Sequence, residues 1–521
     1  MPKWLKDAVF YEIYPQSFYD TNGDGIGDFN GIIEKLDYIK GLGCNALWIN
    51  PCFDSPFHDA GYDVRDYKKV APRYGTNSDL YRLFGEAHRR GIHVLLDLVP
   101  GHTSEEHPWF LESQKAEKNE YSNRYIWTNA AFQPAKGFLY IGGETERDGV
   151  YVLNFFKSQP ALNYGFLNPE EEWQLPVDHP DCVATREAMK DVMRFWLDHG
   201  CDGFRVDMAN SLVKNDDEKK SGTSAIWRNV REMLDAEYPE AAMVSEWNGP
   251  EMAINQGGFH MDFYLNWSGN GYSSLLRDYE CGEEDHSFFK KDGSGDIRRF
   301  LDEYLPRYEA TRENGYYCLI TCNHDTKRPK YNLDDSELKI AYAFLFTMPG
   351  VPFLYYGDEI GMRYLELKTK EGGYGRTGSR TPMQWTNGKN AGFSTCPADA
   401  LYLPVDTAEG APSVAAQEAD KNSLLSTVKD LLRLRHEEED LQADGDFEVV
   451  YAESGKLPFV YRRGSLLLAL NPSTERVSAP VAEADAGKKV LYAIGNGEVK
   501  GQEILLAPQS FVVWRSERIK N

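Results

Sequence analysis

The sequence predicts an α/β protein: a (β/α)8 (TIM) barrel with an inserted subdomain after its third strand and a C-terminal antiparallel β-sandwich. Short apolar, β-rich segments alternate with helical segments eight times, which is typical of a parallel barrel. The alternation pauses after the third strand, where Asn, Trp, Tyr and Gly are frequent and periodicity is weak. Near the C-terminus short strands follow one another without helices. We therefore expect the barrel in residues 1–102 and 179–440, the insertion in 103–178 and the sandwich in 441–521.

Composition restricts the class of protein. The 521 residues are 41% hydrophobic, enough for a globular chain of two or three domains, and the formal net charge of −24 argues against a nucleic-acid partner. The eight cysteines contain no CxxC pair, so free thiols in a reducing compartment are expected. The N-terminus has no apolar signal core, and no apolar run is long enough for a membrane span. We expect a cytoplasmic protein that binds neither membranes nor nucleic acid.

Each predicted barrel strand is short and rich in apolar residues. The eight strands are expected at residues 8–14, 45–49, 93–98, 202–206, 242–245, 260–265, 317–321 and 352–356. The clearest amphipathic helices are expected at residues 30–42, 78–90, 186–199, 224–237 and 422–441. Asn77 or Ser78 is the expected N-cap of the second helix, and Gly91 its C-cap. The sandwich strands are expected at residues 447–451, 459–462, 466–470, 489–492, 503–506 and 510–515.

A loop after the first strand has the composition of a metal site. Oxygen-bearing side chains stand at positions 1, 3, 5 and 9 of this loop, glycine stands at position 6, and position 7 can offer a backbone carbonyl. The residues are Asp20, Asn22, Asp24, Ile26 and Asp28. Gly31 replaces the glutamate that an EF-hand has at position 12, so the pattern favours a Ca²⁺ or Mg²⁺ loop of another kind over a simple Asx/Gly turn. No organic cofactor is expected.

Charged residues stand at the C-terminal ends of several predicted strands, where barrel enzymes place catalytic groups. They are Asp97 and His102 after the third strand, Arg205 and Asp207 at the fourth, Glu246 after the fifth, and His324 and Asp325 after the seventh. One buried ion pair explains Arg205 and Asp207 equally well on their own. Several carboxylates directed at one another are different, because crowding them costs free energy unless a ligand or reaction uses the arrangement.

Retaining glycoside hydrolysis requires such a set. One carboxylate attacks the anomeric carbon and a second, ~5 Å away, protonates the leaving oxygen. Arg205 favours the ionised form of Asp207, the expected nucleophile, while Glu246 lies between Val244 and Trp247 near other negative charges and is the expected acid. Asp325 is placed to hold ring hydroxyls. The aromatic content of 13% fits either core packing or platforms for sugar rings, and composition does not distinguish them.

Four motifs in this order resemble the α-amylase family of glycoside hydrolases (family 13) across nearly the whole chain. They are Asp97-Leu-Val-Pro-Gly-His102, Gly203-Phe-Arg-Val-Asp207, Glu246-Trp247 and Asn323-His324-Asp325. The resemblance implies that Asp207 is the nucleophile, Glu246 the acid/base and Asp325 the transition-state stabiliser. It also implies that His102, Arg205 and His324 hold the sugar in the −1 subsite.

Two further segments resemble the oligo-1,6-glucosidase, α-glucosidase and trehalose synthase branch of that family. Gly61-Tyr62-Asp63 implies that Tyr62 stacks on the −1 sugar while Asp63 binds its far hydroxyls. The stretch from Ser379 to Trp385 implies that Arg380 pairs with that aspartate. The metal loop is also similar to that of the branch. The likeness indicates an enzyme for short oligosaccharides more than an endo-amylase.

Three positions depart from the family pattern. Gly101 stands where a calcium-binding asparagine is usual, Ala161 replaces an aspartate in a fifth motif, and Met208 follows the nucleophile where linkage preference is set. The leading hypothesis is a retaining α-glucosidase of short α-glucan oligosaccharides. A trehalose synthase-like or sucrose-active transglycosylase or isomerase is the close alternative, and a non-catalytic sugar-binding protein is the alternative of another class.

Overall fold

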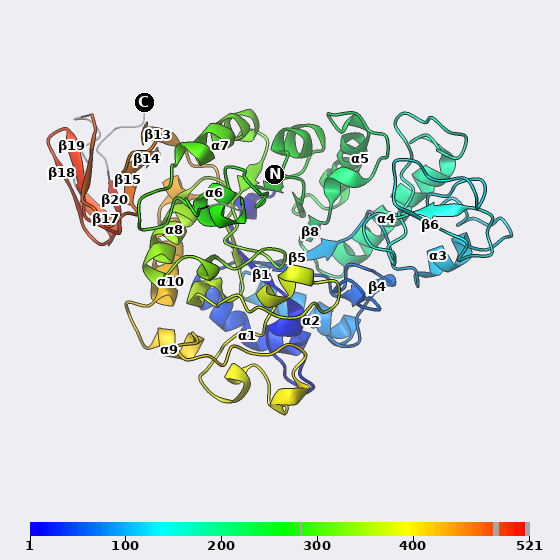
Figure 1. Cartoon of the computed structure of the whole chain (residues 1–521), viewed down its shortest axis with the longest axis horizontal. Helices are drawn as coiled ribbons and strands as arrows, with labels where there is room; N and C mark the ends of the chain where they lie inside the picture. The colour runs from blue at the N-terminus through cyan, green and yellow to red at the C-terminus, as the bar shows by residue number, and fades with distance from the viewer. Residues whose placement is uncertain (282–283, 483–488, 516–521) are drawn as a thin grey trace.

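A computed structural model of the chain describes residues 1–281, 284–482 and 489–515 (Figure 1). Residues 483–488 and 516–521 of the expected sandwich domain therefore lie outside the described residues. Within the described part of the chain, no helix is long and apolar enough to cross a membrane. All eight cysteines are free, as expected, and only Cys281 is exposed.

The core of the molecule is a parallel eight-stranded sheet, which confirms the predicted barrel. Its strands are β1 (Phe10–Ile13), β2 (Ala46–Ile49), β5 (His93–Leu98), β8 (Gly203–Val206), β9 (Ala242–Ser245), β10 (Met261–Phe263), β11 (Tyr316–Cys318) and β12 (Phe353–Tyr355). They pair in parallel in chain order, and β12 returns to pair with β1. A parallel bridge between Ile320 and Phe353 joins the segment after β11 to β12, so the barrel is nearly closed.

A helix follows each barrel strand. These helices are α1 (Phe29–Leu42), α2 (Asn77–Arg89), α4 (Pro180–Asp198), α5 (Ser221–Glu237), η4 (Glu251–Gln256, π-helical), α7 (Arg298–Thr311), α8 (Asp335–Thr347) and α10 (Leu424–Glu437). The shorter α6 (Ser273–Leu276) and α9 (Val414–Glu418) lie in the connections. The expected N-cap of α2 was wrong by one residue or more: Thr76 caps it, in a capping box with Asp79.

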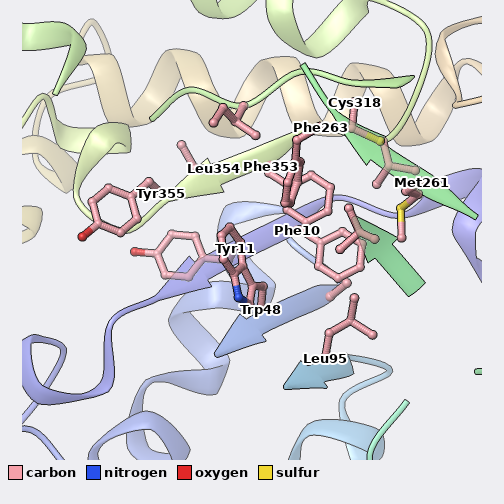
Figure 2. Packing of buried hydrophobic residues seen from close by; sticks show 14 of the residues in the cluster. Phe10, Tyr11, Trp48, Leu95, Met261, Phe263, Cys318, Phe353, Leu354 and Tyr355 are labelled. Carbon is pink, nitrogen blue, oxygen red and sulfur yellow. The ribbon is translucent and has the colours of Figure 1, made fainter. Parts of the chain in front are cut away.

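Aromatic and aliphatic side chains fill the barrel interior (Figure 2). The rings of Phe10 and Phe353, from neighbouring strands, stack with centroids 4.3 Å apart. Trp48 stacks on Phe263 from across the barrel at 5.4 Å. All four are almost fully buried. The interior is therefore a packed core, and the polar side chains of the candidate site lie at its C-terminal end.

The insertion between β5 and β8 has its own small core. It contains α3 (Pro108–Ser113) and the antiparallel pair β6 (Tyr140–Gly142) and β7 (Val150–Val152), and it extends from one side of the barrel (Figure 1). The buried residues of this core are Ile126, Ala135, Val150, Val152, Ala161, Phe166 and Trp173. A second short pair, β3 (Phe53–Asp54) and β4 (Asp66–Val70), follows β2 and carries the turn around Tyr62.

The C-terminal part forms two antiparallel sheets at the opposite end of the molecule (Figure 1), as predicted. The five-stranded sheet contains β13 (Glu448–Tyr451), β14 (Phe459–Arg463), β15 (Leu466–Asn471), β20 (Ser510–Arg515) and β17 (Lys489–Ile494). The three-stranded sheet contains β16 (Val477–Pro480), β19 (Glu503–Leu506) and β18 (Gly497–Lys500). Two strands, β16 and β18, were not expected, because each is four residues long and mostly exposed.

Candidate active site

Arg205 is the centre of the polar cluster at the mouth of the barrel. In β8, Phe204 and Val206 pack in the core, and Arg205, which is 1% exposed, turns to the interior. Its Nη1 donates to Asp97 Oδ1 at 2.8 Å and to Asp207 Oδ1 at 3.0 Å. Its Nη2 lies 2.8 Å from Glu246 Oε2. One guanidinium therefore contacts a carboxylate from each of three adjacent strand ends.

Strand register produces this convergence. Asp97 in β5 pairs with Arg205 in β8, and Val206 pairs with Ser245 in β9, so Asp207 and Glu246 are the next residues along. The close approach of the two strands requires glycine at position 203, where φ is +139° and an added Cβ would lie 1.9 Å from the Ala242 carbonyl oxygen.

Met208 turns the chain sharply after the expected nucleophile. Its backbone is left-handed, with φ of 41°, which is unusual for a residue with a long side chain. Its N–H donates to Glu246 Oε2 at 2.9 Å. Glu246 thus accepts from Arg205 and from Met208, whereas the sequence indicated apolar neighbours and nearby negative charges as its surroundings. Its side chain remains 20% exposed, so a ligand can reach it.

Burial governs the ionisation of the carboxyls around Arg205. It raises the pKa of Asp97 to about 6, against the opposing effect of the Arg205 charge. Burial and then the Glu246 charge raise the pKa of Asp207, while Arg205 lowers it.

His324 and Asp325 follow β11 and reach the same mouth. His324 is fully buried, and its Nε2 lies 2.6 Å from the Tyr62 hydroxyl, which in turn donates to Asp97 Oδ2 at 3.1 Å. The rings of His324 and Tyr62 stack at 5.4 Å. Burial lowers the pKa of His324 well below its usual range, so the imidazole is neutral. Tyr62 therefore links the β11 and β5 parts of the cluster.

Two arginines hold Asp325. Arg376 Nη1 and Arg380 Nη2 each donate to Asp325 Oδ1 at 2.9 Å, and Arg380 Nε also donates to the His324 carbonyl at 2.9 Å. Burial opposes ionisation, but the charges of Arg376 and Arg380 hold the pKa of the Asp325 carboxyl below its usual range. Asp325 is therefore an ionised carboxylate with 30% of its side chain exposed to the mouth.

The expected role of Asp63 is not supported, and its neighbour Asp59 occupies the site instead. Asp63 is fully buried and accepts hydrogen bonds from Ser55 Oγ and from the backbone N–H groups of His58 and Asp59, so it closes a turn. The arginine expected to pair with it, Arg380, contacts Asp325.

Asp59 accepts from Gln159 Nε2 at 2.7 Å and lies 3.9 Å from Arg376 Nη2. Burial raises the pKa of Asp59 to about 6. The sequence analysis missed Asp59, and the presence of two aspartates four residues apart in this turn is a signal that could have pointed to it. No signal in the sequence pointed to Arg376, because the residues that it contacts lie far from it along the chain.

His102 lies beside the cluster but both ring nitrogens already have protein partners. Asn154 Nδ2 donates to Nδ1 at 3.0 Å, so Nε2 carries the hydrogen that donates to the Tyr62 carbonyl at 3.0 Å. Burial lowers the pKa of His102 to about 4. Contact between His102 and a sugar stays a prediction.

The loop from Asp20 to Asp28 is held by Asx turns. Asp20 accepts the N–H groups of Gly23 and Gly25, Asn22 accepts that of Asp24, and Asp24 accepts that of Ile26. Asp28 accepts from Gly31 N and caps α1. No group of three or more His, Cys, Asp or Glu side chains suited to a metal ion occurs among the described residues. A bound ion at this loop stays a prediction.

A parallel barrel whose mouth gathers carboxylates from adjacent strands around an arginine is the construction of enzymes that break glycosidic bonds. The family described as "Alpha amylase, catalytic domain" matches residues 12–444. The chain belongs to the α-amylase family, whose members hydrolyse or transfer glycosyl groups at O-glycosyl bonds.

Relatives within the family include both hydrolases and isomerases. The oligo-1,6-glucosidase of Heyndrickxia coagulans is 32% identical and covers 99% of this chain and 100% of its own. The trehalose synthase/amylase TreS of Mycolicibacterium smegmatis is 35% identical over 83% of this chain and 76% of its own. The solved isomaltulose synthase of Erwinia rhapontici, in complex with D-glucose, has a TM-score of 0.81 at 26% identity, covering 99% of this chain and all of its own.

Proposed function

We propose that the protein is a retaining α-glucosidase that acts on short α-glucan oligosaccharides through a covalent glycosyl-enzyme intermediate. The observation that supports this best is the placement of Asp207 and Glu246 on the two terminal nitrogens of Arg205. This holds two carboxyls at close range beside one cation, as the double displacement requires.

In the first step an Asp207 oxygen attacks the anomeric carbon while Glu246 gives its proton to the departing glycosidic oxygen. In the second step Glu246 removes a proton from water, whose oxygen displaces Asp207. Asp325, ionised beside Arg376 and Arg380, is suited to bind two ring hydroxyls and to stabilise positive charge on the ring. Arg205 and the Met208 N–H both contact Glu246 Oε2, so Oε1 is the oxygen suited to carry the proton to the leaving group.

A transglycosylase or isomerase is the second candidate, because TreS and isomaltulose synthase share this fold and family. The covalent intermediate is common to both, and the acceptor, water or a sugar, separates them. Chromatography of maltose, isomaltose, panose, sucrose and starch digests tests both. Glucose and shortened chains support the glucosidase, trehalose or isomaltulose supports the isomerase, and no product from any sugar contradicts both.

An aromatic cluster of Phe155, Phe156 and Tyr374 supports an oligosaccharide substrate. Tyr374 is 59% exposed and Phe155 47% exposed, and the Phe156 ring lies 4.5 Å from Phe155 and 5.8 Å from Tyr374. The cluster is adjacent to the site in sequence, since Tyr374 is two residues from Arg376. Exposed flat rings at a site mouth suit the apolar faces of sugar rings.

Replacing Tyr374 with alanine is expected to raise KM for maltotriose about three- to tenfold, because one stacking contact is worth ~0.5–1.5 kcal/mol. Methyl α-glucoside has no second sugar, so its KM should not change. Tyr140→Ala, at a tyrosine of similar exposure in β6, is the control and should change neither KM. Equal increases of KM for both substrates would contradict a role in binding the second sugar.

The Asp20–Asp28 loop is proposed to bind Ca²⁺ through Asp20, Asn22, Asp24, Asp28 and the Ile26 carbonyl, an all-oxygen set that suits a hard cation. Calcium is expected to raise Tm of the wild type and not of Asp24→Ala, since a ligand that binds only the folded state stabilises it. Asp217→Ala, at another aspartate in an exposed turn, should keep the calcium effect. Titration calorimetry that detects no calcium or magnesium binding would contradict the proposal.

A further inference from the structure

A buried glutamate on β1, which no step above uses, contacts the ring of His324. Glu12 is fully buried, and its Oε1 lies 2.9 Å from His324 Nδ1. Asn50, which follows β2, places its Nδ2 3.1 Å from Glu12 Oε1 and 3.1 Å from the same Nδ1. The three side chains therefore form a compact group on the side of the imidazole that faces away from Tyr62.

The hydrogen positions in this group are restricted by its donors and acceptors. The Tyr62 hydroxyl has one hydrogen and donates it to Asp97 Oδ2, so His324 Nε2, 2.6 Å from the Tyr62 oxygen, must carry the hydrogen of the neutral imidazole. Nδ1 is then unprotonated, and beside an ionised Glu12 it would face a carboxylate lone pair at 2.9 Å. This conflict disappears when Glu12 carries a proton and donates it to Nδ1, while Glu12 Oε1 still accepts from Asn50.

The surroundings of the second oxygen of Glu12 also favour a neutral carboxyl. Glu12 Oε2 has no hydrogen-bond partner among the described residues, and an ionised oxygen buried without a donor is costly. Burial raises the pKa of Glu12 well above its usual range. The hydrogen bond from Asn50 and the charge of Arg205 oppose this, and Asp97 and Asp325 add to it. Tyr355, from β12, is the other titratable group that faces it.

We propose that Glu12 is a positioning residue: its protonated carboxyl donates to Nδ1 of His324 and fixes the tautomer that carries hydrogen on Nε2. The consequence is a directed series of hydrogen bonds. Nε2–H donates to the Tyr62 oxygen at 2.6 Å, and the Tyr62 hydroxyl donates to Asp97 Oδ2 at 3.1 Å. The Nε2–H of His324 is thus directed at Tyr62, and it orients the Tyr62 hydroxyl toward Asp97 at the mouth of the barrel. The role of this series of hydrogen bonds in catalysis rests on the proposed function, whereas the assignment of the His324 tautomer does not.

Glu12→Gln keeps a neutral donor of the same shape, and Glu12→Met removes it. The glutamine variant is expected to keep kcat within about threefold and the pH–rate profile unchanged. The methionine variant is expected to lose about tenfold or more in kcat, corresponding to one catalytic hydrogen bond, with a smaller change in KM. ¹⁵N NMR of histidine-labelled protein, with the His324 signal assigned from His324→Asn, should show an unprotonated Nδ1 in the wild type and in Glu12→Gln only.

Glu359 provides a matched control for loss of a buried glutamate. It is fully buried, one of its oxygens accepts from the hydroxyls of Tyr11 and Tyr38, and the other is unpartnered among the described residues. Glu359→Met should lower Tm without changing the His324 signal or the pH–rate profile.

A hydrogen on Nδ1 in the wild type, or a His324 signal unchanged in Glu12→Met, would overturn the inference. So would a large loss of kcat in Glu12→Gln, because an ionised Glu12 would then be required. Should the wild type act on no glucoside, the NMR measurement still decides the tautomer.

Discussion

Replacing Asp207 with asparagine is expected to lower kcat by about 10³- to 10⁵-fold, because the amide cannot form the glycosyl ester. The fold should persist, since Asp207 lies at the end of β8 with one side-chain contact, to Arg205. Binding should persist too, because Asp325 and its arginines are untouched. The measurements are kcat on the best substrate of the sugar panel, Kd by calorimetry and Tm.

Asp202→Asn is the control at the other end of the same strand. Asp202 contacts His88 and His93, away from the mouth, so its replacement should affect stability and leave kcat within a few-fold. Activity of Asp207→Asn within tenfold of the wild type would refute the nucleophile assignment. An equal loss of kcat in Asp207→Asn and in Asp202→Asn would instead indicate that both replacements damage β8.

Replacing Arg205 with methionine is expected to lower the free energy of unfolding by ~3–5 kcal/mol at neutral pH, because three carboxylates lose their shared cation. The loss should depend on pH. The folded pKa of Asp97, about 6, exceeds the ordinary aspartate value of ~3.9. Protonation of Asp97 thus stabilises the folded state below pH ~4. This contribution to the free energy of unfolding is lost as the pH rises through 6.

Without Arg205 the pKa of Asp97 should rise further. The free energy of unfolding of the variant should therefore continue to fall at pH values where that of the wild type no longer changes. The difference in urea-unfolding free energy between wild type and Arg205→Met should therefore be larger at pH 8 than at pH 5. Arg328→Met, at a buried arginine that contacts the single carboxylate of Asp358, should show a smaller pH dependence. A difference that is the same at both pH values would contradict the shared-cation account.

The barrel and most of the mouth could be predicted because they follow local rules. Apolar segments of strand length separated by helical spacing locate the eight barrel strands, and charges at the ends of parallel strands converge. Asp97, Arg205, Asp207 and Glu246 meet as that rule requires. The short strands β16 and β18 were missed, because each has four residues with at most one buried side chain and so offers no apolar run.

What could not be predicted depends on the direction of single side chains. Asp59 and Asp63 occupy one turn, and only their hydrogen bonds show that Asp63 closes the turn. Arg376 and Arg380 both contact Asp325, across more than fifty residues of sequence. Glu12 stands in an otherwise apolar strand. An acidic residue in such a strand was a signal in the sequence that the prediction did not use.

The single guanidinium shared by three carboxylates also bears on inhibitor chemistry. Asp97, Asp207 and Glu246 give the mouth an excess of anionic groups over the one cation beside them. A negatively charged pocket favours a sugar ring that carries positive charge, as the oxocarbenium-like transition state does. Glucose mimics with a protonated ring nitrogen should therefore bind more tightly than neutral glucose analogues of the same shape.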